Sequence, residues 1–176
     1  MKLKRLKFAR LGYILISVLF YIAGFYCILS HRLSPEECAV SSGIILIVYG
    51  IIKIIGYVSK DIYSLAFQYD FACGTLLIVL GLIVLFACAR FFGYLSPGLG
   101  VLILLDSLLS IQTSIDAQKF GIRQWYVILA ASIVAGTFGV LQIVAGSHLT
   151  AGLALLAEGF LRQSVVLFTV PPAHHA

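Results

Sequence analysis

The chain has 176 residues, of which 61% are hydrophobic and 11% charged, and its formal net charge at pH 7 is +5. Soluble domains carry roughly 25% charged residues and about 45–50% apolar ones, and small domains leave a large part of their surface in water. This composition therefore excludes a soluble globular domain, a disordered chain and a disulfide-rich secreted module. It indicates a single domain that is integral to a membrane.

Six segments are apolar and long enough to cross a bilayer as helices, which need about 20 mostly apolar residues each. We therefore predict an all-α membrane helical bundle with six transmembrane helices, at residues 11–30, 39–58, 71–89, 95–111, 125–145 and 149–168. A basic tail of residues 1–10 precedes this domain of residues 11–168, and a short tail of residues 169–176 follows it.

Two of the six segments, 95–111 and 149–168, contain an acidic residue, which leaves an alternative with four spans and two re-entrant or interfacial segments. Asp106 lies in the fourth segment, but ten Leu, Ile or Val residues accompany it. Each of these favours insertion by roughly 0.3–0.6 kcal/mol, against a cost of about 2.5–3.5 kcal/mol for one central Asp. The balance favours six spans. Residues 93–100 are rich in glycine and contain Pro97, so we expect a helix break there, at the membrane edge.

The basic residues predict the orientation of the spans. If the spans alternate, the five basic residues of the N-terminal tail fall on one side with Lys60, Lys119 and Arg123, whereas Arg32 and Arg90 fall on the other. Lys and Arg are enriched in cytoplasmic loops. Both termini are therefore predicted to be cytoplasmic. The net positive charge is an orientation signal, and no nucleic-acid partner is expected.

The sequence contains an internal repeat. Tyr13, Tyr69 and Trp125 each open an apolar run and are 56 residues apart, and similar runs recur at residues 43–50, 99–106 and 151–158. The third of these runs comes four residues early, which predicts a shortened last turn. Each repeat contains two spans, so the six spans are predicted to form three helical hairpins. Short apolar runs also resemble one another by chance, and this alternative stays open.

Four ionisable residues interrupt the even-numbered spans: Lys53, Asp106, Glu158 and Arg162. An ionisable group inside the membrane is costly and is a functional hypothesis by default. Glu158 and Arg162 are four residues apart with the acid first, which is the better order for a helical ion pair, and Asp106 could meet Lys53. These residues form a candidate polar cluster. It either senses or relays protons, or it consists of structural ion pairs, with Lys53 and Arg162 extending to the headgroups.

Other chemistry-bearing patterns are missing from the sequence. It has no nucleophile elbow, phosphate-binding glycine loop, HExxH motif or pair of catalytic carboxylates, the patterns that mark common enzyme sites. The adjacent His174 and His175 are too few for a structural metal site. We therefore expect no enzyme activity, no catalytic residues, no cofactor and no metal.

The chain resembles the HdeD-like family of acid-resistance membrane proteins. The clearest match is Gly50-Ile51-Ile52-Lys53-Ile54-Ile55, followed by a polar loop and the aromatic at Gln68-Tyr69, with Gly74 and Gly81 in the next span. The resemblance covers residues 11–168 and implies a short six-span plasma-membrane protein built from three repeated hairpins, with a link to acid stress.

Three functions follow as hypotheses from the residues and the resemblance. The first is a non-enzymatic multi-pass membrane protein that supports acid or envelope stress tolerance. The second is a small channel or transporter subunit that uses the intramembrane charges. The third is a structural partner in a membrane complex. The expected partners are the lipid bilayer and either further copies of the chain or other membrane proteins.

Overall fold

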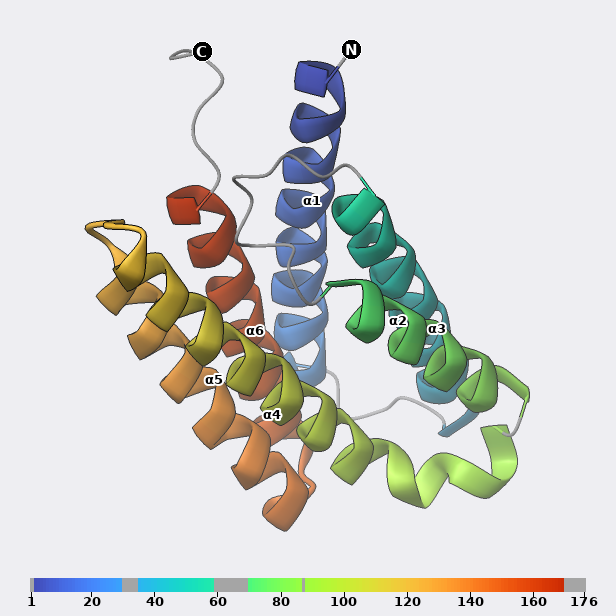
Figure 1. Cartoon of the computed structure of the whole chain (residues 1–176). Coiled ribbons are helices and arrows are strands. Elements are labelled where there is room, and N and C mark those ends of the chain that lie inside the picture. The colour runs from blue at the N-terminus through green and yellow to red at the C-terminus, as the bar shows by residue number, and fades with distance from the viewer. Residues whose placement is uncertain (1, 30–34, 59–69, 87, 170–176) are drawn as a thin grey trace.

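The computed structural model is all-helical and describes residues 2–29, 35–58, 70–86 and 88–169, with side chains described for 11–29, 43–55, 57, 71–86 and 96–168. Its six helices follow one another along the chain (Figure 1). They are α1 (Lys2–Leu29), α2 (Pro35–Val58), α3 (Asp70–Phe86), α4 (Cys88–Lys119), α5 (Trp125–Ala145) and α6 (His148–Thr169).

Every predicted span falls mainly on one of these helices, but α1 and α4 extend furthest beyond their predicted bounds. α1 begins at Lys2, so most of the expected tail is helical, as its Lys, Arg and Leu residues favour. α4 runs eight residues past the predicted end at residue 111, because Thr113, Ser114 and Ala117 continue its buried face. Residues 170–176 of the predicted C-terminal tail lie outside the described residues, as do the predicted loop positions Arg32 and Lys60.

Four of the helices are long and apolar enough to cross a membrane: Leu11–Leu29, Ser96–Lys119, Trp125–Ala145 and His148–Phe168. The described apolar parts of α2 and α3 are shorter, Gly43–Ile55 and Phe71–Phe86. Large apolar side chains are exposed on all six helices. Soluble monomers rarely expose so much apolar surface, and together with the four long apolar helices this makes the chain a helical membrane protein.

The helix break expected around Pro97 is wrong, because α4 continues through this residue. Figure 1 shows α4 bending in its N-terminal part instead. A proline can remain inside a membrane helix when neighbouring groups bind the backbone carbonyls that it frees. Pro97 frees the carbonyl four residues earlier, and Gln142 on α5 contacts the residue directly before the proline, donating from Nε2 to Ser96 Oγ at 2.7 Å and to the Ser96 carbonyl at 3.4 Å.

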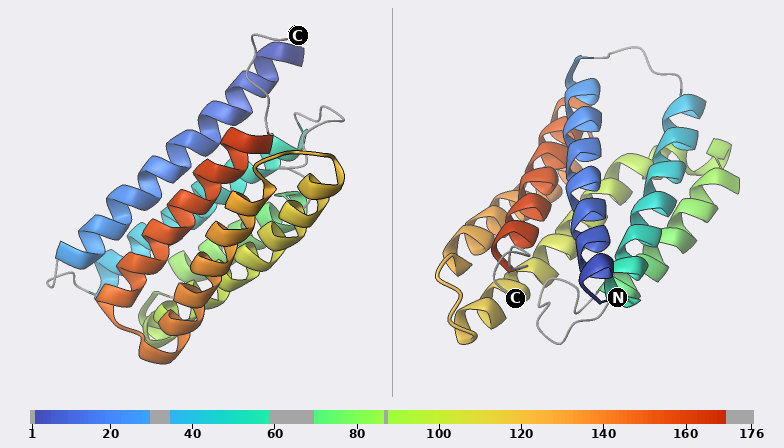
Figure 2. Two further views of the ribbon diagram at one scale, coloured as in Figure 1. Left: turned by 90° about the vertical axis from the view of Figure 1, so that its left-hand side faces the viewer. Right: turned by 90° about the horizontal axis from the view of Figure 1, so that it is seen from above.

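The helices pack most closely in pairs that differ from the predicted hairpins. The tightest pairs are α2 with α3, α4 with α5, and α1 with α6, and both views in Figure 2 show these three pairs. Successive hairpins therefore share a close interface, and the last helix closes the arrangement on the first. α5 also contacts α6, as predicted for the third hairpin, whereas α1 and α2 contact each other much less.

Glycines hold each pair at close range. A Cβ atom added at Gly152 would lie 2.7 Å from the Gly24 carbonyl oxygen, one at Gly81 would lie 2.8 Å from that of Gly43, and one at Gly100 would lie 2.7 Å from that of Gly139. Seven residues away along two of the pairs a second backbone contact repeats the pattern, joining Gly159 to Ser17 and Gly50 to Gly74. In the third pair the side chain of Ser107, seven residues after Gly100, contacts Gly136, three residues before Gly139. Small residues at such positions let helix backbones approach closely in lipid.

These contacts correct the register of the repeat. In the even-numbered helices the equivalent glycines are residues 43, 100 and 152, spaced by 57 and 52, and in the odd-numbered helices they are residues 24, 81 and 139, spaced by 57 and 58. The predicted offset of 56 is therefore wrong by one or two residues. Gly50 is equivalent to Ser107 and Gly159, so its predicted equivalence to Asp106 and Glu158 is also wrong.

The last turn is shortened by six residues rather than four. Gly139 and Gly152 are 13 residues apart, whereas the corresponding glycines of the first two hairpins are 19 apart. A left-handed glycine explains the tight turn, because Gly146 ends α5 at φ 58° and its N–H donates to the Gln142 carbonyl. Ser147 and Thr150 then exchange backbone-to-side-chain hydrogen bonds that cap α6.

A candidate polar network between the helix pairs

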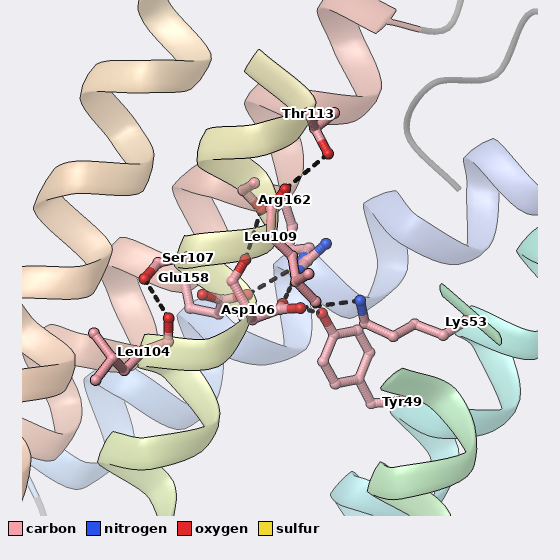
Figure 3. A network of polar contacts seen from close by, with 10 residues as sticks. Tyr49, Lys53, Leu104, Asp106, Ser107, Leu109, Thr113, Glu158 and Arg162 are labelled. Atoms are coloured by element: carbon pink, nitrogen blue, oxygen red, sulfur yellow. Dashed lines mark hydrogen bonds and ion pairs between the residues drawn. The ribbon is translucent and has the colours of Figure 1, made fainter. Parts of the chain in front are cut away.

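The structure brings all four predicted ionisable residues together where the even-numbered helices meet (Figure 3). Lys53 comes from α2, Asp106 from α4, and Glu158 and Arg162 from α6. The residues are 1%, 9%, 2% and 4% exposed, in that order. Together with Tyr49 they form what we call the buried charge network.

Asp106 is the centre of this network. Its Oδ1 accepts a hydrogen bond from Lys53 Nζ at 3.1 Å, and its Oδ2 accepts one from Tyr49 Oη at 2.9 Å. The Arg162 guanidinium also contacts Oδ2. Three donors, two of them cationic, therefore converge from two neighbouring helices on one carboxylate. Hydrogen bonds between ionised groups are about twice as strong as neutral ones.

Glu158 and Arg162 form the second ion pair, within α6. Arg162 Nε donates to Glu158 Oε1 at 2.9 Å. The other carboxylate oxygen, Oε2, is buried and accepts no hydrogen bond from any described residue. The two acids of the network therefore differ, since Asp106 has donors on both oxygens and Glu158 on only one.

Tyr49 is a network residue that the sequence analysis did not select. The phenol is 5% exposed and packs edge-on against Phe20 of α1, with ring centroids 5.2 Å apart. Lys53 Nζ lies 5.2 Å and Arg162 Cζ 5.7 Å from the centroid of the Tyr49 ring, within the range of a cation–π attraction. The tyrosine therefore donates to the central carboxylate and also faces both cations.

The corrected repeat register explains why these residues meet. Tyr49, Asp106 and Glu158 occupy one equivalent position of the three even-numbered helices, since they are 57 and 52 residues apart. One helical turn later the same spacing relates Lys53, Ser110 and Arg162. The network thus lies in two adjacent layers, one helical turn apart. Each layer is formed by one position that recurs in the three even-numbered helices. The heptad spacing of small residues in the sequence was a signal that could have identified Tyr49.

The charges of the network are balanced, with two acids and two bases. Removal of one partner of a buried ion pair strongly destabilises the folded protein. Because the pairs of this network join separate helices, they link α2, α4 and α6. No group of three His, Cys, Asp or Glu side chains that could hold a metal ion occurs among the described residues. The chemistry available at this point is ion pairing, hydrogen bonding and proton exchange.

Comparison with known protein families gives a match to part of the chain. A family model described as a short repeat of unknown function (DUF308) matches residues 15–86. The matched segment contains most of α1 and all of α2 and α3, and it therefore includes the complete α2–α3 pair together with Tyr49 and Lys53. No curated protein and no solved structure matches the chain. The chain is thus a helical membrane protein in which residues 15–86 are similar to the DUF308 repeat.

Proposed function

We propose that the chain is a non-enzymatic multi-pass protein of the plasma membrane that supports tolerance of acid or envelope stress. The resemblance to the HdeD-like family suggests this role, and the DUF308 match to residues 15–86 supports the resemblance. Both termini are proposed to be cytoplasmic. The beginning of α1 and the end of α6 lie toward the same end of the bundle (Figure 1), as this topology requires.

The buried charge network is the observation that carries the proposal. Its four ionisable residues are almost fully buried, yet they lie in helices whose outer faces are apolar. Residues of this kind inside a membrane are expensive and mark functional sites more often than chance. Because the charges of the network are balanced and link three helices, an acid-dependent change in one charge directly changes how these helices pack.

The test combines cell survival with protein stability. Deletion of the gene is expected to lower survival after acid or envelope challenge, and the wild-type chain is expected to restore it. Glu158→Gln and Asp106→Asn are then compared with Asp116→Asn, which changes an exposed ion pair of α4. The proposal is supported if Glu158→Gln and Asp106→Asn fail to restore survival whereas Asp116→Asn restores it. Unchanged survival with lowered thermal stability leaves the network a structural role alone.

A channel or transporter subunit is the second candidate. Ionisable residues from α2, α4 and α6 converge at one buried point among the three helix pairs, which is where a polar pathway through a bundle would run. Purified protein in liposomes should then conduct protons or a solute, and Asp106→Asn should abolish the flux. Absence of flux in protein that is folded and inserted would exclude this function.

A further inference from the structure

We propose that Glu158 is the proton-binding residue of the buried charge network, and that its unpartnered oxygen Oε2 takes the proton. This inference deepens the function proposed above, on which its physiological meaning rests. It rests on the difference between the two acids of the network in the hydrogen-bond donors that contact their carboxylate oxygens.

The first step is a comparison of hydrogen-bond donors. Asp106 has donors from Tyr49 and Lys53 and contacts Arg162, so its charged form is stabilised on both oxygens. Glu158 has one donor, Arg162 Nε, on Oε1. Its Oε2 has none among the described residues, although Glu158 is 2% exposed. A buried acceptor without a donor destabilises the folded state, and more so when it is charged.

The second step identifies the groups that face Glu158 from the neighbouring helices. Arg162 lies on its own helix, Asp106 on α4, and Tyr49 and Lys53 on α2, and Lys53 interacts electrostatically with Glu158. Cys73 of α3 interacts with Lys53 and Tyr49. Among the described residues of α1, the buried titratable side chain is that of Tyr13. The buried residues described on α5 include no titratable side chain.

The third step is the charge balance of proton uptake. A proton from solution forms an O–H bond at Oε2 and converts the carboxylate to a neutral carboxylic acid. The network then changes from balanced to one excess positive charge, because Lys53 and Arg162 now share only Asp106. Lys53 belongs to α2 and Arg162 to α6, so their repulsion acts between helices of different pairs. Proton uptake is therefore expected to loosen the α2–α3 pair from α6.

Infrared spectroscopy of the full chain in lipid tests the assignment directly. Lowering the pH from neutral to mildly acidic should produce a carboxylic acid C=O band from a buried group. The band should persist in Asp106→Asn and in the surface variant Asp116→Asn, and disappear in Glu158→Gln. A band that is lost in Asp106→Asn and kept in Glu158→Gln, or a wild type without any band, would overturn the proposal.

Isotope labelling keeps the test valid even when a variant fails to fold. The chain contains three glutamates, at positions 36, 37 and 158. With Glu36→Gln and Glu37→Gln introduced, ¹³C-labelled glutamate shifts the band of Glu158 alone, whereas labelled aspartate should leave the band unchanged. The reverse labelling pattern would assign the proton to an aspartate and contradict the proposal.

The outcome is separable from that of the proposed function. If the band belongs to Glu158 but deletion of the gene leaves survival unchanged, the proton site stands and the proposed function fails. If survival depends on the chain but no glutamate band appears, the proposed function stands and the proton site fails.

Discussion

The close backbone contacts within the helix pairs are made by small residues, whereas the contacts between the pairs include buried charges. Within a pair, Gly50 and Gly74 bring two backbones together without a polar side chain. Between pairs, Lys53 of α2 reaches Asp106 of α4 through a buried ion pair. Small residues stabilise helix contacts in lipid because they let the backbones approach closely, whereas removal of either partner of a buried ion pair leaves an uncompensated charge. Pairing and assembly of the pairs should therefore respond differently to mutation.

The largest effect is expected from Lys53→Met, which leaves Asp106 with one cation fewer in a buried site. Breaking a buried ion pair typically costs about 3–5 kcal/mol. Lys119→Met is the matched control, because Lys119 pairs with Asp116 at 3.3 Å on the surface, against 3.1 Å for the buried pair. Loss of an exposed pair costs at most about 1 kcal/mol. Equal losses of thermal stability in the two variants would contradict the role of burial.

A smaller effect is expected from Gly50→Ala within the α2–α3 pair. The added Cβ would lie 2.6 Å from the Gly74 carbonyl oxygen, so the backbones must separate. Overpacking of this kind costs about 1–3 kcal/mol. In Gly98→Ala the Cβ meets nothing within 4 Å, and better helix propensity should stabilise that variant by about 0.5–1 kcal/mol. Thermal unfolding in the same detergent compares the two, and a neutral Gly50→Ala would argue against close pairing.

Tyr49→Phe tests the hydrogen bond to Asp106 without removing the ring that faces both cations. A hydrogen bond to a charged group contributes about 1.5–3 kcal/mol, so a loss near the lower value is expected because Asp106 keeps Lys53 and Arg162. Tyr26→Phe is a suitable control, since Tyr26 is 51% exposed. A Tyr49→Phe variant as stable as the control would remove Tyr49 from the network.

The smallest effect is a partial rescue that tests the repeat register. Ser110 occupies on α4 the position that Lys53 occupies on α2, and its hydroxyl already donates to the Asp106 carbonyl. Adding Ser110→Lys to Lys53→Met returns a cation one turn from Asp106. A recovery of about 1 kcal/mol is expected, less than the full pair because two neighbouring sites in contact are not additive. Further destabilisation by Ser110→Lys would contradict the register.

Composition and hydropathy predicted the membrane class and the six helices, because transfer of apolar residues into lipid depends on local sequence. The four ionisable residues were also predictable, since any charge within an apolar span is conspicuous. The pairing of the helices was not predictable from the sequence. Whether Gly24 packs against Gly152 or against the other helix of its own hairpin depends on three-dimensional contacts. Tyr49 escaped notice for the same reason, as its polar role exists only once Asp106 lies beside it.

The closure of α1 on α6 has a consequence for biosynthesis. The first helix enters the bilayer while the ribosome is still translating the other five, so its own partner arrives last. A chain that terminates before residue 148 leaves the Gly24 face of α1 without that partner. In such a truncated product the surface of α1 that α6 covers in the complete fold is left exposed, so the first helix is the last to obtain its closest neighbour.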